Sequence, residues 1–259
     1  MNFHTDFLNH PVFPKNYDFP LVMLSIFIAV LASFSSFGIV ERYKSVNSLN
    51  QKIFWNFFGA LSMGLGIWVM HFAGMIALKL PVPVQYNLLL TVSSIAPALI
   101  VSSFVLWLLT IEKINLVNLK FYALLFVLGI CSMHYTGMAA MQLNATKFYD
   151  PVCLLLSLIA AFLLAYFALR INTTYVFWSD NFFKQQIISA TVMGSAISGI
   201  HYLSMSSVNF INNQKFEVDR MGIDPDNLLS IVFAVACGLV LSAIVLPLLL
   251  KYYQLCTIN

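Results

Sequence analysis

Seven long stretches of this sequence contain no charged residue, and this feature restricts the fold more than any other. All 23 charged residues of the 259-residue chain, 13 basic and 10 acidic, lie between these stretches. A helix that crosses a bilayer needs about 20 mostly apolar residues, and only helices and closed barrels satisfy the backbone in lipid. Barrel strands are much shorter than these stretches. The sequence therefore predicts an all-α polytopic membrane protein with seven transmembrane helices, the sixth of which stops near Val208. The stretches cover residues 19–40, 53–78, 86–111, 121–146, 151–169, 185–214 and 227–250.

The overall composition excludes several classes of protein. Apolar residues make up 60% of the chain and charged residues 9%, whereas an ordinary soluble domain carries about 25% charge. The net charge of +3 is spread along the chain, so we expect a lipid bilayer around the protein and no nucleic acid as a partner. The four cysteines form no C-x-x-C pair. No nucleophile, base and acid share one depth, which argues against an enzyme.

The distribution of lysine and arginine predicts an orientation, because these residues favour the cytoplasmic side of a membrane. With the amino terminus outside, the inner segments hold eight basic residues and the outer segments five. We therefore expect an extracytoplasmic tail over 1–18 without a cleavable signal peptide, a membrane domain over 19–251 and a cytoplasmic tail over 252–259. The expected inner segments are too short to fold as a soluble output domain.

A sequence motif recurs three times, at residues 66–75, 129–138 and 196–205. It reads small-Ile-x-x-[Met/Ile]-His-aromatic-x-small-Met, and its histidines are 63 and then 67 residues apart. Each copy lies in an even-numbered predicted helix. The membrane domain is therefore predicted to consist of three two-helix repeats followed by a seventh helix.

The motif places one histidine in each of the three even-numbered helices. His71, His134 and His201 lie 8–10 residues before the predicted outer helix ends, or roughly 12–15 Å below the outer boundary. One histidine in a membrane helix often only bonds a neighbouring helix. Three at one depth indicate a shared site, because ionisable groups inside a membrane are usually functional. A methionine four residues further along lies on the same helix face as each histidine, and these are Met75, Met138 and Met205.

Histidine together with thioether sulfur favours copper over other metals. No aspartate or glutamate lies in any predicted helix, and an unbalanced buried charge is costly. These points favour Cu(I), with Cu(II) feasible if water, hydroxide or tyrosine contributes, and zinc ranks lower because it seldom uses methionine. Secondary candidates stand next to the histidines: Met70 and Met133 before them, and Tyr135 and Tyr202 after them. The two tyrosines could equally be interfacial anchors.

The segment Met133-His134-Tyr135-Thr136, followed by Gly137-Met138, spells the motif of the MHYT domain. The chain resembles this bacterial seven-helix membrane sensor domain over residues 20–250. The resemblance implies a copper-binding domain in the bacterial cytoplasmic membrane that senses oxygen, carbon monoxide or nitric oxide. Two positions depart from the motif, Phe72 in the first copy and Ile200 in the third. The positions that carry the family's motif are Met70, His71, Met75, Met133, His134, Tyr135, Met138, His201, Tyr202 and Met205.

Family members are often fused to diguanylate cyclase, phosphodiesterase or kinase modules. For this chain we expect a metal-binding sensor that is not itself an enzyme and that signals through a partner protein in trans. Two alternatives remain open at this stage: a protein that transports or handles copper, and a haem-binding electron-transfer protein.

Overall fold

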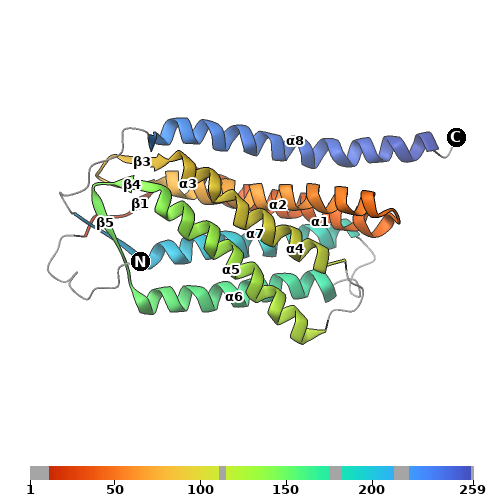
Figure 1. Ribbon diagram of the computed structural model, residues 1–259, viewed down its shortest axis with the longest axis horizontal. Coiled ribbons are helices and arrows are strands. Elements are labelled where there is room, and N and C mark those ends of the chain that lie inside the picture. The colour runs from red at the N-terminus through yellow and green to blue at the C-terminus, as the bar shows by residue number, and fades with distance from the viewer. Residues whose placement is uncertain (1–11, 111–114, 175–181, 213–221, 258–259) are drawn as a thin grey trace.

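A bundle of long helices with short strands at one end forms the protein in the computed structural model (Figure 1). The structure describes residues 12–110, 115–174, 182–212 and 222–257, and it describes the side chains of these residues except 41, 116, 172–174, 182, 212 and 242–257. The helices are α1 (Phe19–Ser45), α2 (Leu49–Ala77), α3 (Leu88–Ser93), α4 (Ile95–Leu108), α5 (Leu116–Ala140), α6 (Pro151–Thr174), α7 (Phe182–Ser206) and α8 (Pro225–Thr257).

The expected all-α polytopic architecture is confirmed. Within the described part of the chain, six helical spans are long and apolar enough to cross a membrane, and α3 with α4 counts as one of them. The apolar part of α8, Pro225–Leu241, is a shorter seventh. The chain is therefore a multi-pass membrane protein.

Several predicted helix limits are wrong, because charge alone does not mark where a helix ends. The fourth uncharged stretch continues past its helix into strands, so α5 ends at Ala140, whereas α7 ends at Ser206, close to the predicted end near Val208. Conversely, α1 and α8 extend beyond their uncharged stretches and include Glu41 and Asp226. The expectation that no helix contains an acidic residue is wrong at these two helix ends.

Seven short strands cluster at one end of the bundle, which we call the strand end (Figure 1). They pair antiparallel in three small sheets, ordered β1-β2, β4-β3-β7 and β5-β6. The sheets were not predicted, because each strand is only two to five residues long. The strands are β1 (Asn16–Tyr17), β2 (Leu78–Lys79), β3 (Val84–Asn87), β4 (Met141–Leu143), β5 (Ala145–Tyr149), β6 (Val208–Asn212) and β7 (Gly222–Ile223).

Three helices that begin at the strand end share one kind of N-cap. The side chains of Asp18, Asn87 and Asp150 accept hydrogen bonds from backbone N–H groups two or three residues further on, at 2.9–3.3 Å. These bonds satisfy donors that a helix start leaves unpaired. Each cap directly follows a tyrosine, so a Tyr-Asx pair introduces α1, α3 and α6. The tyrosines are Tyr17, Tyr86 and Tyr149.

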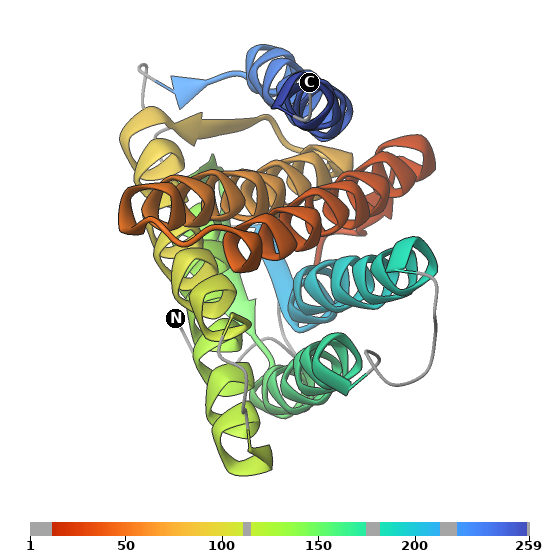
Figure 2. The ribbon, with the colours of Figure 1, turned by 90° about the vertical axis from the view of Figure 1, so that its right-hand side faces the viewer.

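Helix α2 lies at the centre of the bundle. In its most apolar 18-residue segment 89% of the residues are buried, whereas the figure for α6 is 28%. Figure 2 looks along the bundle from the end away from the strands and shows α8 at its edge, where α8 contacts α1 and α2. Close backbone approach depends on small residues. A Cβ at Gly194 of α7, for example, would lie 2.6 Å from the backbone of Val30 in α1. Helices α2, α5 and α7, which carry the three histidine motifs, contact one another.

Candidate metal centre

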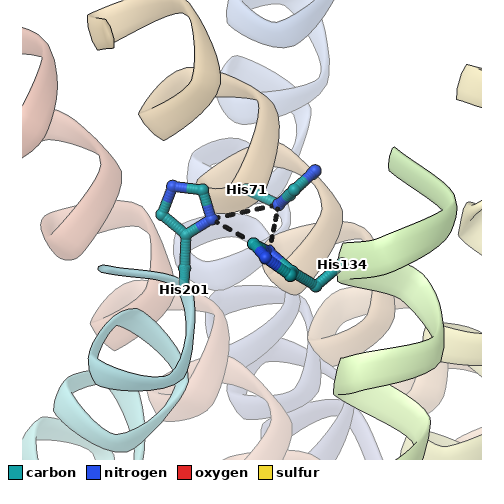
Figure 3. A group of neighbouring side chains, drawn as sticks. All are labelled: His71, His134 and His201. Atoms are coloured by element: carbon teal, nitrogen blue, oxygen red, sulfur yellow. Dashed lines mark hydrogen bonds between the residues drawn. The ribbon is translucent and has the colours of Figure 1, made fainter. Parts of the chain in front are cut away.

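The three repeat histidines converge in the interior of the bundle (Figure 3). The Nδ1 atom of His71 lies 3.1 Å from that of His201 and 3.2 Å from that of His134, and the last two are 3.3 Å apart. The three side chains are at most 1% exposed. Their rings meet edge to face, with centroids 4.9–5.3 Å apart. The predicted convergence of the three imidazoles is confirmed.

The distance of the histidines from the helix ends differs from the prediction. They lie six, six and five residues before the ends of α2, α5 and α7, which corresponds to roughly 8–9 Å along the helix axis. The predicted 8–10 residues is too many, because the chain turns from helix into strand earlier than its lack of charge indicates. The three histidines nevertheless share one level, as expected.

The small residue three positions after a histidine makes room for the imidazole of another repeat. Nε2 of His201 lies 2.5 Å from the place where a Cβ would stand at Gly74, and the ring of His71 occupies the corresponding space at Gly137. The third copy has Ser204 at this position. His71 of α2 therefore packs against Gly137 of α5, and His201 of α7 packs against Gly74 of α2. In these positions their Nδ1 atoms face a common centre.

The arrangement of nitrogen atoms suits a bound cation. The centre of the Nδ1 triangle lies about 1.8 Å from each nitrogen, slightly less than the ~2.0–2.1 Å of a zinc–imidazole bond. The Nδ1 atoms lie at hydrogen-bonding distance, and the tautomer of each ring decides which of them donate. With all three rings protonated at Nε2, three lone pairs face one point and repel each other unless a positive charge lies near it. Among the described residues, the group of possible metal ligands contains three histidines and no carboxylate. The residues therefore fit a cation held by neutral ligands.

The repeat methionines lie in two layers of the core. Met75, Met138 and Met205 are buried in the apolar cluster that also contains strand residues. Met70 and Met133 are buried in the cluster that extends away from the strands. In α2 and α5, the histidine follows one of these methionines directly and precedes the other by four residues. That any of these methionines binds the metal stays a prediction.

Aromatic residues extend outward from each histidine toward the strand end. The rings of Phe72, Tyr135 and Tyr202 lie 4.8–5.0 Å, centroid to centroid, from the histidine that precedes each of them. Each then meets the tyrosine of a Tyr-Asx pair at 5.8–6.0 Å. We call these three series the aromatic columns; they are His71–Phe72–Tyr86, His134–Tyr135–Tyr149 and His201–Tyr202–Tyr17.

The two candidate tyrosines beside the histidines differ in their hydrogen bonds. Tyr202 Oη lies 2.7 Å from Ser25 Oγ and is hydrogen-bonded to it, and Ser25 Oγ also lies 2.7 Å from the carbonyl oxygen of Val22. The Oη of Tyr135 is buried and has no hydrogen-bond partner among the residues that the structure describes. Both rings pack beside the site, and the hydroxyl of Tyr202 is already engaged away from the nitrogen triangle.

Two lysines missed by the sequence analysis hold the helix ends beside the site. Lys147 Nζ donates to the carbonyls of Met138 and Met141, and Lys15 Nζ donates to those of Met205, Ser206 and Val208. These carbonyls lie where α5 and α7 end and lack helical partners. Burial lowers the pKa of Lys147 to about 8 and also lowers that of Lys15.

The outer tyrosines of two aromatic columns could have been found from the sequence. Tyr86 and Tyr149 each follow their repeat histidine by 15 residues, and each precedes an Asx residue. This repeated Tyr-Asx pair is shorter than the histidine motif and consists of common residues, so it is easily overlooked. His4 and His10, which could have captured metal in the N-terminal tail, lie outside the described residues.

Comparison with known proteins places the repeats in a family. The family sequence model described as MHYT, a bacterial signalling protein N-terminal repeat, matches residues 64–119 and 128–179. The two matched segments contain the first and second histidine motifs. No solved structure is similar enough to match.

The chain is similar to three curated signalling proteins. It is 34% identical, over 91% of its length, to the bifunctional diguanylate cyclase/cyclic di-GMP phosphodiesterase MucR of Pseudomonas aeruginosa. It is 32% identical over 73% of its length to the cyclic di-GMP phosphodiesterase NbdA of the same species, and 34% identical over 75% to the signaling protein YkoW of Bacillus subtilis. These alignments cover 34%, 24% and 24% of the respective relatives. With its repeated motif, its multi-pass helical fold and the matched segments, the chain belongs to the MHYT family.

Proposed function

We propose that this chain is a membrane sensor domain whose three histidines bind a copper ion, with Cu(I) as the favoured state. The observation that carries the proposal is the convergence of three buried Nδ1 atoms at 3.1–3.3 Å. His71, His134 and His201 would hold the ion, and Met75, Met138 and Met205 would supply thioether sulfur from the strand side.

The charge of the site supports a monovalent ion. The ligand group has no carboxylate among the described residues, and the three histidines are almost completely buried. Transfer of charge into such surroundings is costly, and the cost grows with the charge of the ion. Neutral imidazole and thioether are ligands that suit copper, and thioether in particular selects Cu(I). A Cu(I) ion would supply a redox-active centre with affinity for small diatomic gases.

The geometry favours a single ion over haem. A porphyrin bound between two axial histidines must fit between their ligating nitrogens, and Nδ1 atoms 3.1–3.3 Å apart leave no space for it. No contact described here favours transport over sensing. The names of the relatives favour sensing, because they describe cyclic di-GMP enzymes and a signalling protein.

In this proposal, oxygen, carbon monoxide or nitric oxide reaches the site from the strand end, which faces outward across the bacterial cytoplasmic membrane. The amino terminus then lies outside and the carboxyl terminus inside. The state of the site passes to a signalling partner that makes or degrades a cyclic dinucleotide, as the relatives are named to do.

Metal analysis of the purified full chain tests the proposal. The protein is loaded with Cu(I) under anaerobic conditions, desalted and assayed for copper, beside a variant in which all three histidines are alanine. We expect about one copper per chain in the unaltered protein and a loss of at least tenfold in the variant. Equal copper in both proteins would overturn the site. Far-ultraviolet circular dichroism confirms that the variant keeps its helices.

A matched control separates the site from histidine content in general. Replacement of His4 and His10 by alanine removes two histidines of the N-terminal tail and should leave bound copper unchanged. Zinc and haem are measured in the same samples. Stoichiometric zinc without copper, or a haem absorption band, would replace the copper proposal with one of the alternatives.

A further inference from the structure

A second candidate site lies at the opposite end of the bundle from the strands. A groove of about 710 Å³ opens on the membrane-facing surface between α2 and α4. It is lined by Tyr43 of α1, by seven residues of α2 between Leu49 and Leu61, and by five residues of α4 between Leu99 and Trp107. None of these lining residues belongs to the histidine site.

The groove matches one leaflet of a bilayer in length. From Leu49 to Leu61 the helix rises about 18 Å, and half of a bilayer's hydrocarbon core measures about 15 Å. Its deeper part is apolar, and the side chains of Phe57 and Ile100 are 59% and 70% exposed there. Acyl chains pack well against such a surface.

Polar groups collect at the end of the groove that lies nearest the start of α2. Lys52 stands in the first turn of the helix, with Nζ 5.8 Å from the centroid of the Tyr43 ring. One turn deeper, Asn56 Nδ2 donates to Ser103 Oγ of α4 at 2.7 Å. No lining residue is acidic. The groove is therefore positively charged at its mouth, polar one turn below it and apolar beyond.

The start of α2 adds a further preference for negative charge. The N-cap, Ser48, makes no side-chain capping bond, and the first turn contains no acidic residue. Unpaired backbone N–H groups and the helix dipole favour an anion at such a position. The charge of Lys52 lies in the same turn.

We propose that this groove binds one anionic phospholipid, with its phosphate at Lys52 and the start of α2. The ester region then lies level with Asn56 and Ser103, and one acyl chain follows Ile53, Phe57 and Ile100. The occupant is a phospholipid and not a second copy of the chain, because the succession of charged, polar and apolar lining repeats the succession within a lipid molecule. The inference is independent of the copper site.

Lipid titration followed by native mass spectrometry tests this site. Delipidated full-length protein in detergent is titrated with dioleoyl phosphatidylglycerol or dioleoyl phosphatidylcholine. We expect the first phosphatidylglycerol to bind at least fivefold more tightly than phosphatidylcholine. The variant Lys52→Gln should lose that preference, since one lysine near an anionic lipid contributes about fivefold in affinity. An unchanged preference in Lys52→Gln would overturn the proposal.

Two further variants locate the binding. Lys120→Gln removes an exposed charge from α5 outside the groove and should keep the preference for phosphatidylglycerol. If Lys120→Gln loses this preference as Lys52→Gln does, the preference is a general effect of charge and the site is refuted. Ile100→Trp fills the groove from a position that is 70% exposed, so the fold should persist while lipid binding falls. If Ile100→Trp instead leaves lipid binding intact and separates a dimer into monomers, the groove is a subunit interface and the lipid proposal is wrong.

Discussion

The imidazole of His71 fills the space that a side chain at Gly137 would need. The nearest atoms to a Cβ at that position are Nε2, Cδ2 and Cε1 of the ring. A glycine in α5 thus determines where a histidine of α2 can lie. The same relationship joins Gly74 to His201, so the small residue of the repeat motif belongs to the site as much as the histidine does.

The variant Gly137→Ala should therefore damage the metal centre without unfolding the protein. The added methyl group displaces the His71 ring, and a shift of about 1 Å separates its Nδ1 from the other two nitrogens. We expect copper affinity to fall at least tenfold in a competition titration with a Cu(I) chelator. Gly238→Ala is the matched control, because a Cβ there meets nothing within 4 Å. Loss of affinity in both variants would contradict this explanation.

The sequence predicts the membrane architecture and the ligand histidines because both depend on strong local signals. A charged residue is costly inside lipid, so uncharged stretches mark the spans. A rare residue such as histidine, repeated at the same place in three helices, marks the shared site. Helix ends were predicted less well, because a helix can include Glu41 near its end and because the residues after Ala140 are apolar but form strands.

The contacts that orient the site could not be predicted, since they join segments distant in sequence. Lys15 bonds carbonyl groups 190 to 193 positions away, at the end of α7 and just after it. Tyr17 meets Tyr202 across a comparable separation. Their residue types are common near membrane surfaces, and only the packing of the repeats brings them together.

Replacement of the site methionines should separate metal binding from stability. Met205→Leu conserves volume, so we expect the free energy of unfolding to change by less than ~1.5 kcal/mol. Copper affinity should fall about tenfold if sulfur binds the ion. Met193→Leu is the control, because Met193 is equally buried but belongs to the other core cluster. A triple variant replaces Met75, Met138 and Met205 by leucine. If its copper affinity is unchanged, the histidines are the only protein ligands.

Lys147 should make the stability of the fold depend on pH. Its folded-state pKa is about 8, below the ordinary value of 10.5, because burial disfavours the charged form. Between these values the unfolded chain binds more protons at this residue, so the stability contributed by this lysine rises with pH. We expect the melting temperature in detergent to rise from pH 8 to 10 more steeply than in Lys147→Gln. Parallel slopes in the two proteins would show that the lysine titrates normally.

The bond between Tyr202 and Ser25 should position the third aromatic column without contributing to metal binding. Tyr202→Phe removes the hydroxyl and keeps the ring beside His201, so we expect a loss of about 0.5–1.5 kcal/mol in stability and unchanged copper affinity. Ser25→Ala should cost a similar amount. The double variant should cost less than the two single losses together, because the same bond is removed in each. Thermal unfolding of the four proteins measures this coupling. A tenfold fall in copper affinity in Tyr202→Phe alone would make the phenol a ligand instead of a neighbour of the site.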